Sequence, residues 1–220
     1  MISEKIGLAS QAILRSIVGN LSRLRIRPNH LTFMGFLASI LAAFAFARGH
    51  FRLAGAVLIL AGLFDMVDGM VARKTHAETP FGAFFDSVMD RYSDLIMYMG
   101  LLIHFANLGR NNYVVLVAVC MMGSVLISYT RARAESIIPS CKVGFLERPE
   151  RMVLLIIGSF YRMEPVLWVI GVLSNWTVVH RIIHTRATIR AMEPKGERSE
   201  EEAPTEGTPR KLSHPNPLVS

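Results

Sequence analysis

Aspartates at helical spacing are the most informative group of residues in this chain. Asp65 and Asp68 lie three positions apart, and Asp86 and Asp90 lie four positions apart after a short interruption. Residues three or four apart share one face of an α-helix, so each pair predicts an acidic helix face. Hard carboxylate oxygens suit Mg²⁺ or Mn²⁺, and two such ions bridged by shared aspartates assist phosphoryl chemistry. The spacing therefore predicts a divalent-metal site built from two helices.

These carboxylates lie at the ends of strongly apolar segments, where they are costly unless something neutralises them. A carboxylate in the middle of a membrane helix costs roughly 2.5–3.5 kcal/mol on insertion scales. Four unpaired carboxylates would cost on the order of 10–14 kcal/mol, so we expect divalent cations to offset that cost. A role in helix capping or as surface charge would explain a single aspartate better than it explains this set. Asp94, four residues after Asp90, is expected to pair with an arginine rather than to bind metal.

Apolar helices must position these aspartates. Of the 220 residues, 51% are hydrophobic and the mean hydropathy is +0.37, which is typical of a small polytopic membrane protein. We expect an all-α integral membrane fold of six transmembrane helices, in which the two acidic helices are antiparallel neighbours. The expected spans are 31–48, 53–73, 81–106, 113–133, 149–161 and 165–183.

The two ends of the chain differ from this apolar middle. Residues 1–27 form an expected amphipathic segment on the membrane surface, because apolar residues recur there near helical spacing. The membrane domain then occupies residues 28–192. Residues 193–220 are rich in Glu, Pro, Ser and Gly, so we expect a disordered C-terminal tail.

The net charge of +7 comes from basic residues at the ends of the apolar segments. This distribution favours anionic lipids and substrates as partners and argues against nucleic acid. The excess of Lys and Arg on one side predicts a protein of the cell (inner) membrane whose N-terminus and acidic clusters face the cytoplasm. The opposite side keeps only four expected cations, which are Arg48, Arg52, Arg110 and Arg162.

The acidic pattern resembles the signature of a known enzyme family. The spacing Asp65-x2-Asp68-Gly69-x2-Ala72-Arg73-x8-Gly82-x3-Asp86-x3-Asp90 is similar, without gap or substitution, to that of the CDP-alcohol phosphotransferases. The resemblance implies a membrane-embedded homodimer with two Mg²⁺ ions, or Mn²⁺ instead, and CDP-diacylglycerol as the donor. It implies Asp65, Asp68, Asp86 and Asp90 as metal ligands, with Asp90 also the catalytic base. It further implies contacts to the CDP-lipid from Asn29, His30, Leu31, Thr32, Gly69, Arg73 and Thr79.

Two later segments bear on the acceptor alcohol. Residues 128–135 and 144–151 resemble the phosphatidylinositol phosphate synthases of actinobacteria, whose acceptor is inositol 1-phosphate. Carried over by position, the acceptor contacts are Ser128, Arg131, Arg133, Arg148, Arg151 and Arg181. Clusters of arginine suit phosphate recognition, although the same arginines are also explained by membrane topology. Glu135, Glu147 and Glu150 are expected to orient these arginines.

Other functions remain open from the sequence. Glycerol 3-phosphate as acceptor would make the protein a phosphatidylglycerophosphate synthase, and free inositol would make it a phosphatidylinositol synthase. A divalent-cation transporter is the alternative of another class, because intramembrane aspartates mark ion paths. It is disfavoured because the aspartates lie near helix ends and no internal repeat is visible. A catalytically silent membrane scaffold would not need an intact acidic pattern.

Overall fold

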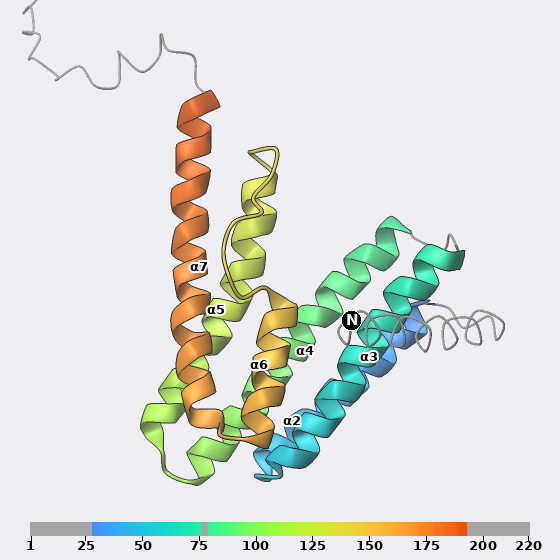
Figure 1. The fold of residues 1–220 in the computed structure, drawn as a ribbon, viewed down its shortest axis with the longest axis vertical. Coiled ribbons are helices and arrows are strands. Elements are labelled where there is room, and N and C mark those ends of the chain that lie inside the picture. The colour runs from blue at the N-terminus through green and yellow to red at the C-terminus, as the bar shows by residue number, and fades with distance from the viewer. Residues whose placement is uncertain (1–27, 76–78, 193–220) are drawn as a thin grey trace, which may run out of the picture.

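The computed structural model describes residues 28–75 and 79–192, and only the backbone of 28, 29, 68, 69 and 71–75. The described residues form six helices and no strand (Figure 1). The helices are α2 (Pro28–Ala47), α3 (Phe51–Thr75), α4 (Pro80–Asn107), α5 (Asn111–Glu135), α6 (Arg148–Phe160) and α7 (Met163–Met192). The predicted all-α class is confirmed. The predicted interfacial segment 1–27 and tail 193–220 lie outside the described residues.

Helix boundaries follow local sequence signals. Pro28 and Pro80 each occupy the first position of a helix, where the missing backbone N–H costs nothing. Thr79 caps α4 because its side-chain oxygen accepts a hydrogen bond from the backbone N–H of Gly82 at 2.9 Å. This cap fixes the start of the helix that carries Asp86 and Asp90.

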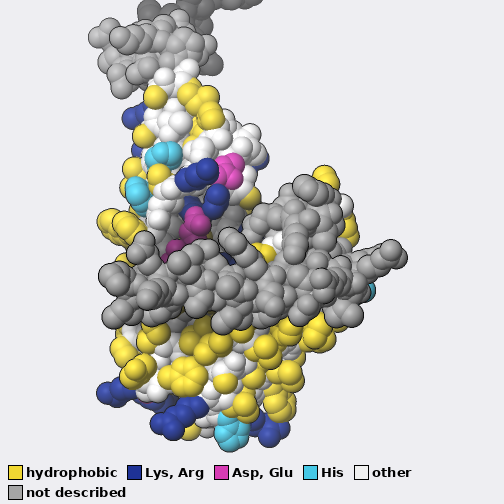
Figure 2. Space-filling view, turned by 45° about the vertical axis from the view of Figure 1, so that its right-hand side comes forward, with side chains coloured by type: hydrophobic (Ala, Val, Ile, Leu, Met, Phe, Trp, Pro, Cys, Tyr) yellow, Lys and Arg dark blue, Asp and Glu magenta, His cyan; other side chains and the backbone are white. Residues whose placement is uncertain are grey.

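Three of the helices are long and apolar enough to cross a membrane: α2 over His30–Ala47, α5 and α7. Large apolar side chains point outward on them, such as Leu41, Val115 and Trp176, as expected for a surface that faces lipid. Figure 2 shows hydrophobic side chains over most of the described lower part of one face, with basic side chains at its lower end.

The core lies where the helices cross. α2 packs on α3 and α4, α4 packs on α5, α7 packs on α5, and α6 packs on α3 and α7. Fully buried side chains such as Phe46, Leu58, Leu101, Leu155 and Leu167 fill the space between them. α3 and α4 follow each other in sequence, but each packs mainly on α2 rather than along the other. The two acidic helices run antiparallel (Figure 1), and Asp65 on α3 and Asp90 on α4 both lie within hydrogen-bond distance of Arg148, so their acidic faces meet across a short gap as expected.

The bundle has two distinct ends. The turns at 48–50, 108–110 and 161–162 lie together at one end (Figure 1). The acidic half of α3, the start of α4 and the start of α6 lie toward the other end. The acidic residues and the cations expected on the opposite side are therefore separated by the length of the helices.

Candidate active site

The described aspartates come together across α3 and α4. Asp65 is on α3, and Asp86 and Asp90 share one face of α4; all three are half-buried. Asp86 and Asp90 both interact electrostatically with Asp65. Asp68 lies one helical turn after Asp65, and only its backbone is described. Helical spacing thus gathers the carboxylates of Asp65, Asp86 and Asp90 at one place in the fold.

Arg148 occupies the space between these carboxylates. One of its terminal nitrogens, Nη1, lies 2.7 Å from Oδ2 of Asp65 and 2.8 Å from Oδ1 of Asp90. Its Nε lies 3.6 Å from Oδ1 of Asp94. Arg148 is the first residue of α6, so the beginning of this helix supplies the positive charge that joins α3 to α4. The sequence predicted Arg148 as an acceptor contact, and no pattern in it predicted that Arg148 would pair with Asp65 and Asp90.

The donor set fits a hard divalent cation. Among the side chains that the structure describes, which do not include that of Asp68, no three His, Cys, Asp or Glu lie close enough to hold an ion as they stand. The guanidinium of Arg148 nevertheless shows that Asp65 and Asp90 share a single cationic partner at hydrogen-bond distance. Carboxylate oxygens that converge in this way are the ligands that Mg²⁺ and Mn²⁺ prefer.

Gly35 on α2 makes room for the Asp65 carboxylate. A Cβ atom at position 35 would lie only 2.7 Å from Oδ1 of Asp65, closer than real Cβ contacts allow. Glycine therefore lets α2 approach α3 where the acidic side chain turns inward. Sequence reasoning missed Gly35, because its only signal is a glycine within an apolar helix.

Asp94 is part of the protein interior. Its Oδ2 accepts hydrogen bonds from Arg151 at 2.6 Å and from the Ser124 hydroxyl at 2.7 Å. Arg151 is only 2% exposed and also donates to the carbonyl oxygen of Leu146 at 3.0 Å. This buried pair joins α4, α5 and α6, and it confirms the prediction that Asp94 pairs with an arginine.

The predicted CDP-lipid contacts lie on three elements. Asn29, His30, Leu31 and Thr32 form the first turn of α2, Gly69 and Arg73 lie near the end of α3, and Thr79 caps α4. His30 is exposed, whereas Leu31 and Thr32 are buried. For Asn29, Gly69 and Arg73 the structure describes only the backbone.

The predicted acceptor residues differ in their environments. Arg131 donates hydrogen bonds to Glu135 at 3.2 Å and to Glu147 at 3.0 Å, and Ser128 lies one turn before it on α5. Arg133 is exposed and donates to the Ser136 hydroxyl at 3.4 Å. Two helical residues two positions apart point in nearly opposite directions, so Arg131 and Arg133 face different sides of α5.

Two hollows mark these two sides of α5. One of about 400 Å³ is lined by Arg131, Lys142 and Glu147, and Glu150 lies exposed beside them. The other, of about 450 Å³, lies between α5 and α7 and is lined by basic side chains that include Arg133 and Arg186. The hollow beside Arg131 is the one that adjoins the segment leading into Arg148.

Arg181 fastens the segment 136–147 to α7. It is 1% exposed, and it donates to the carbonyl oxygen of Val143 at 2.9 Å and to the Glu147 carboxylate at 3.0 Å. Gly144 has φ +113°, a conformation that favours glycine, and a Cβ there would lie 2.3 Å from the Thr177 side chain. Glu147 thus pairs with both Arg131 and Arg181, as predicted for an acid that orients the arginines.

Comparison with known proteins identifies the class. The sequence profile of the CDP-alcohol phosphatidyltransferase family matches residues 25–185. The chain therefore belongs to the CDP-alcohol phosphatidyltransferase family, and the predicted class of enzyme is confirmed.

Two curated relatives show where the chain falls within that family. It is 32% identical to a phosphatidylinositol phosphate synthase of Mycobacteroides abscessus over 85% of this chain and 91% of that protein. It is 31% identical to an archaetidylinositol phosphate synthase of Methanothermobacter thermautotrophicus over 74% of this chain and 84% of that protein.

Solved structures show the same fold with ligands. The phosphatidylinositol phosphate synthase of Mycobacterium tuberculosis with CDP-DAG bound matches with a TM-score of 0.76 at 31% identity, over 83% of this chain and 98% of that one. The same enzyme in complex with manganese and citrate matches with a TM-score of 0.75 at 30% identity, over 82% of this chain and 92% of that one.

Proposed function

We propose that this protein joins CDP-diacylglycerol to inositol 1-phosphate and releases CMP. The observation that carries the proposal is the convergence of Asp65 and Asp90 on one cation, within the family signature. The bacterial and archaeal relatives differ in the lipid part of their names and share the inositol phosphate part. That shared part favours inositol 1-phosphate over glycerol 3-phosphate or free inositol as the acceptor.

In the proposed reaction an acceptor hydroxyl oxygen bonds to the β-phosphorus of CDP-diacylglycerol. The bond from that phosphorus to the bridging oxygen breaks, and CMP leaves with that oxygen. Asp90 accepts the hydroxyl proton. Two divalent ions, when bound, neutralise the pyrophosphate and stabilise the leaving group. Their proposed ligands are Asp65, Asp68, Asp86 and Asp90, with Mg²⁺ as the expected ion and Mn²⁺ as the alternative.

We place the CDP moiety beside the first turn of α2 and the end of α3. His30 is exposed there and is free to reach a nucleotide, while buried Leu31 and Thr32 support the wall behind it. Gly69 allows close approach of a ligand, and Arg73 supplies a positive charge for the pyrophosphate. Thr79 is already engaged as the cap of α4, so its proposed contact is made from the helix start.

Arg148 is proposed to alternate between the aspartates and the acceptor. Its guanidinium must leave Asp65 and Asp90 before these carboxylates ligate ions, and the freed charge then suits the acceptor phosphate. Arg148→Ala is therefore expected to tighten Mn²⁺ binding about tenfold or more, because a competing charge-assisted contact contributes roughly 1.5–3 kcal/mol. Titration of the purified protein with Mn²⁺, followed by electron paramagnetic resonance, measures this directly. Arg148→Lys keeps the charge and is the control; unchanged or weaker Mn²⁺ binding by Arg148→Ala would contradict the competition.

The acceptor phosphate is proposed to lie on the Arg131 side of α5. Ser128 and Arg131 share that face of α5, and Arg131 bonds Glu147, the residue next to Arg148. Buried Arg151 and Arg181 hold the surrounding segments in position. Arg133 remains a predicted contact on the other face of the helix.

Substitution of half-buried Arg131 and of exposed Arg133 tests the two faces of α5 separately. Arg131→Ala is expected to raise the acceptor KM about ten- to a hundredfold, because a charge-assisted hydrogen bond contributes roughly 1.5–3 kcal/mol. The KM for CDP-diacylglycerol should change far less. Acceptor titration at saturating donor gives both values, with Arg133→Ala as the matched control. A larger effect from Arg133→Ala than from Arg131→Ala would move the phosphate to the α5–α7 hollow.

The proposed setting is an integral protein of the cell (inner) membrane with six transmembrane helices. In this arrangement α3, α4 and the short α6 also span the membrane, in addition to the three helices that are long and apolar enough to cross it by themselves. The N-terminus and the aspartates face the cytoplasm in the proposal, in keeping with the excess of basic residues on that side. A homodimer is proposed from family resemblance, with membrane lipid around it.

Release of CMP distinguishes the enzyme from the other classes. Purified protein given CDP-diacylglycerol, inositol 1-phosphate and Mg²⁺ should release CMP, and chelation by EDTA should stop the release. A cation transporter or a silent scaffold would give no CMP under any of these conditions.

A further inference from the structure

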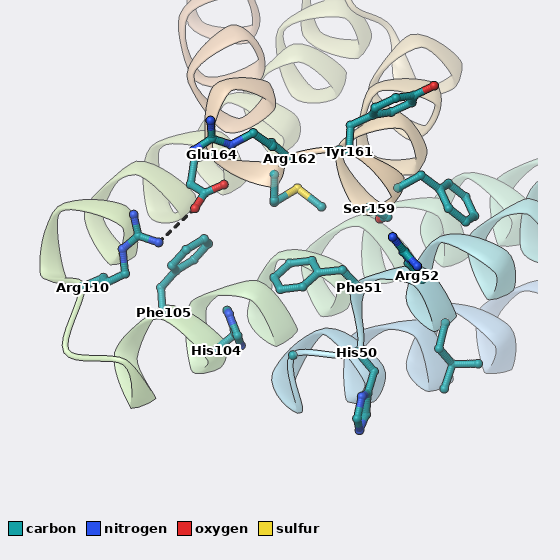
Figure 3. A pocket seen from close by; sticks show the side chains of 15 residues that line it. His50, Phe51, Arg52, His104, Phe105, Arg110, Ser159, Tyr161, Arg162 and Glu164 are labelled. Carbon is teal, nitrogen blue, oxygen red and sulfur yellow. Dashed lines mark hydrogen bonds and ion pairs between the residues drawn. The ribbon is translucent and has the colours of Figure 1, made fainter.

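A second cavity lies at the end of the bundle away from the aspartates. Its volume is about 640 Å³, and it is formed where the turns at 48–50, 108–110 and 161–162 meet (Figure 3). None of the residues proposed for catalysis or for substrate binding lines it. The cavity is therefore separate from the active site.

Arginines from three different turns line this cavity. Arg52 follows the first turn, Arg110 belongs to the second, and Arg162 belongs to the third. Glu164 is the only carboxylate among the lining residues, so the three arginines leave a formal excess of two positive charges. Such an excess in a partly enclosed space attracts an anion.

Arg110 is held in place, and the other two arginines are available. Arg110 donates to Glu164 at 3.0 Å (Figure 3), and its guanidinium carbon lies 4.2 Å from the centre of the Tyr113 ring. Arg52 and Arg162 are exposed and form no hydrogen bond or close ion pair with the described part of the chain, although Arg162 is attracted by the charge of Glu164. Because Glu164 is already bonded to Arg110, a ligand with several acceptor oxygens would give the two exposed guanidinium groups direct hydrogen-bond partners.

The walls between the arginines combine apolar side chains with the polar side chains of His50, His104 and Ser159. The apolar part of the lining comes from Phe51, Phe105, Phe160, exposed Tyr161 and Met163. Apolar walls beside basic side chains suit an amphiphile, because the acyl and glycerol parts contact carbon while the phosphate meets arginine.

These arginines also lie on the side of the membrane domain that is expected to hold few basic residues. The side opposite the acidic clusters is expected to hold four arginines, and three of them surround this one cavity. The fourth is Arg48, whose guanidinium carbon lies 4.6 Å from the centre of the Phe44 ring, and it does not line the cavity. Topology alone gives no reason for the three to gather, whereas a shared anionic ligand does.

We propose that this cavity binds the phosphate of an anionic phospholipid head group in the leaflet opposite the active site. Arg52 and Arg162 contact the phosphate oxygens, and Arg110, fixed by Glu164, supplies the third positive charge. The proposal rests on the membrane-spanning arrangement and not on the proposed reaction.

Lipid binding to purified protein tests the proposal. Delipidated protein in a non-ionic detergent is titrated with phosphatidylglycerol, and bound lipid is counted by native mass spectrometry while thermal unfolding is followed. We expect the variant carrying both Arg52→Gln and Arg162→Gln to lose one bound phosphatidylglycerol and to need at least tenfold more lipid for the same stabilisation. Arg48→Gln, at the same end but outside the cavity, should behave as wild type.

Two further titrations distinguish a phospholipid head group from free phosphate as the bound group. Phosphatidylcholine, which has no net charge, and inorganic phosphate should each stabilise the protein far less than phosphatidylglycerol. Equal stabilisation by inorganic phosphate would overturn the lipid assignment, as would equal lipid binding by the double variant or an equal loss in Arg48→Gln. CMP release should be unchanged in the double variant and in Arg48→Gln, so this test and that of the proposed reaction succeed or fail separately.

Discussion

Replacing Asp65, Asp68 or Asp86 with asparagine is expected to abolish phosphatidyl transfer. Each change removes one charged oxygen ligand from a site whose ions must neutralise a pyrophosphate. Asparagine keeps the size of the side chain, so the loss reports charge rather than packing. The measurement is CMP release at saturating Mg²⁺ for each variant, with activity expected to fall by well over tenfold.

An acid at the opposite end of the bundle provides the control. Glu164 lies in the first turn of α7 and pairs with Arg110, so Glu164→Gln should keep near wild-type turnover. More than about a tenth of wild-type activity in all three aspartate variants would rule out the two-metal account. Retention of the helical circular dichroism spectrum separates loss of function from loss of fold.

Arg151→Ala is expected to destabilise the protein by about 3–5 kcal/mol, because it removes the hydrogen-bonded cation of the buried Asp94 carboxylate and leaves only the more distant Arg148, whose Nε lies 3.6 Å away. The Arg151 and Asp94 groups are 2.6 Å apart and nearly inaccessible to solvent, so water cannot replace the lost partner. Thermal unfolding in detergent should show a clearly lower midpoint than wild type. Expressed as a free energy, the loss of stability should be larger than any loss of acceptor binding seen as a higher acceptor KM.

A double substitution tests the cause of that loss. Replacing Arg151 with Met and Asp94 with Leu removes both charges together, and we expect it to recover much of the stability. Arg133→Ala, an exposed arginine on α5, should leave the unfolding midpoint near wild type. If Arg151→Ala keeps its stability and raises only the acceptor KM, Arg151 contacts the acceptor directly and its positioning role is wrong.

Local patterns in the sequence were sufficient to predict the helices. The expected spans 53–73 and 81–106 agree closely with α3 (Phe51–Thr75) and α4 (Pro80–Asn107). The span 165–183 is shorter than α7, which continues to Met192. Hydropathy detects only the apolar part of a helix, whereas backbone hydrogen bonding continues through the polar turns beyond it.

Contacts between distant segments lie beyond local patterns. The pairing of Arg148 with Asp65 joins residues 83 positions apart, and no periodicity predicts it. The opposite directions of Arg131 and Arg133 follow from helical geometry, but their different hollows depend on where the segment 136–147 and α7 pack. The close approach of Gly35 to Asp65 likewise depends on how α2 crosses α3. Residue types were sufficient to predict the chemistry of the site, but they did not predict which arginine contacts which carboxylate.

The identity of the lipid product tests the central claim most directly. Purified protein receives CDP-diacylglycerol and Mg²⁺ with one acceptor at a time: inositol 1-phosphate, free inositol, glycerol 3-phosphate or serine. Mass spectrometry of the extracted lipid then identifies what was made. The account predicts phosphatidylinositol phosphate from inositol 1-phosphate, with CMP released in equal amount and little product from the other acceptors. Phosphatidylglycerophosphate as the main product, or no lipid product from inositol 1-phosphate, would contradict it.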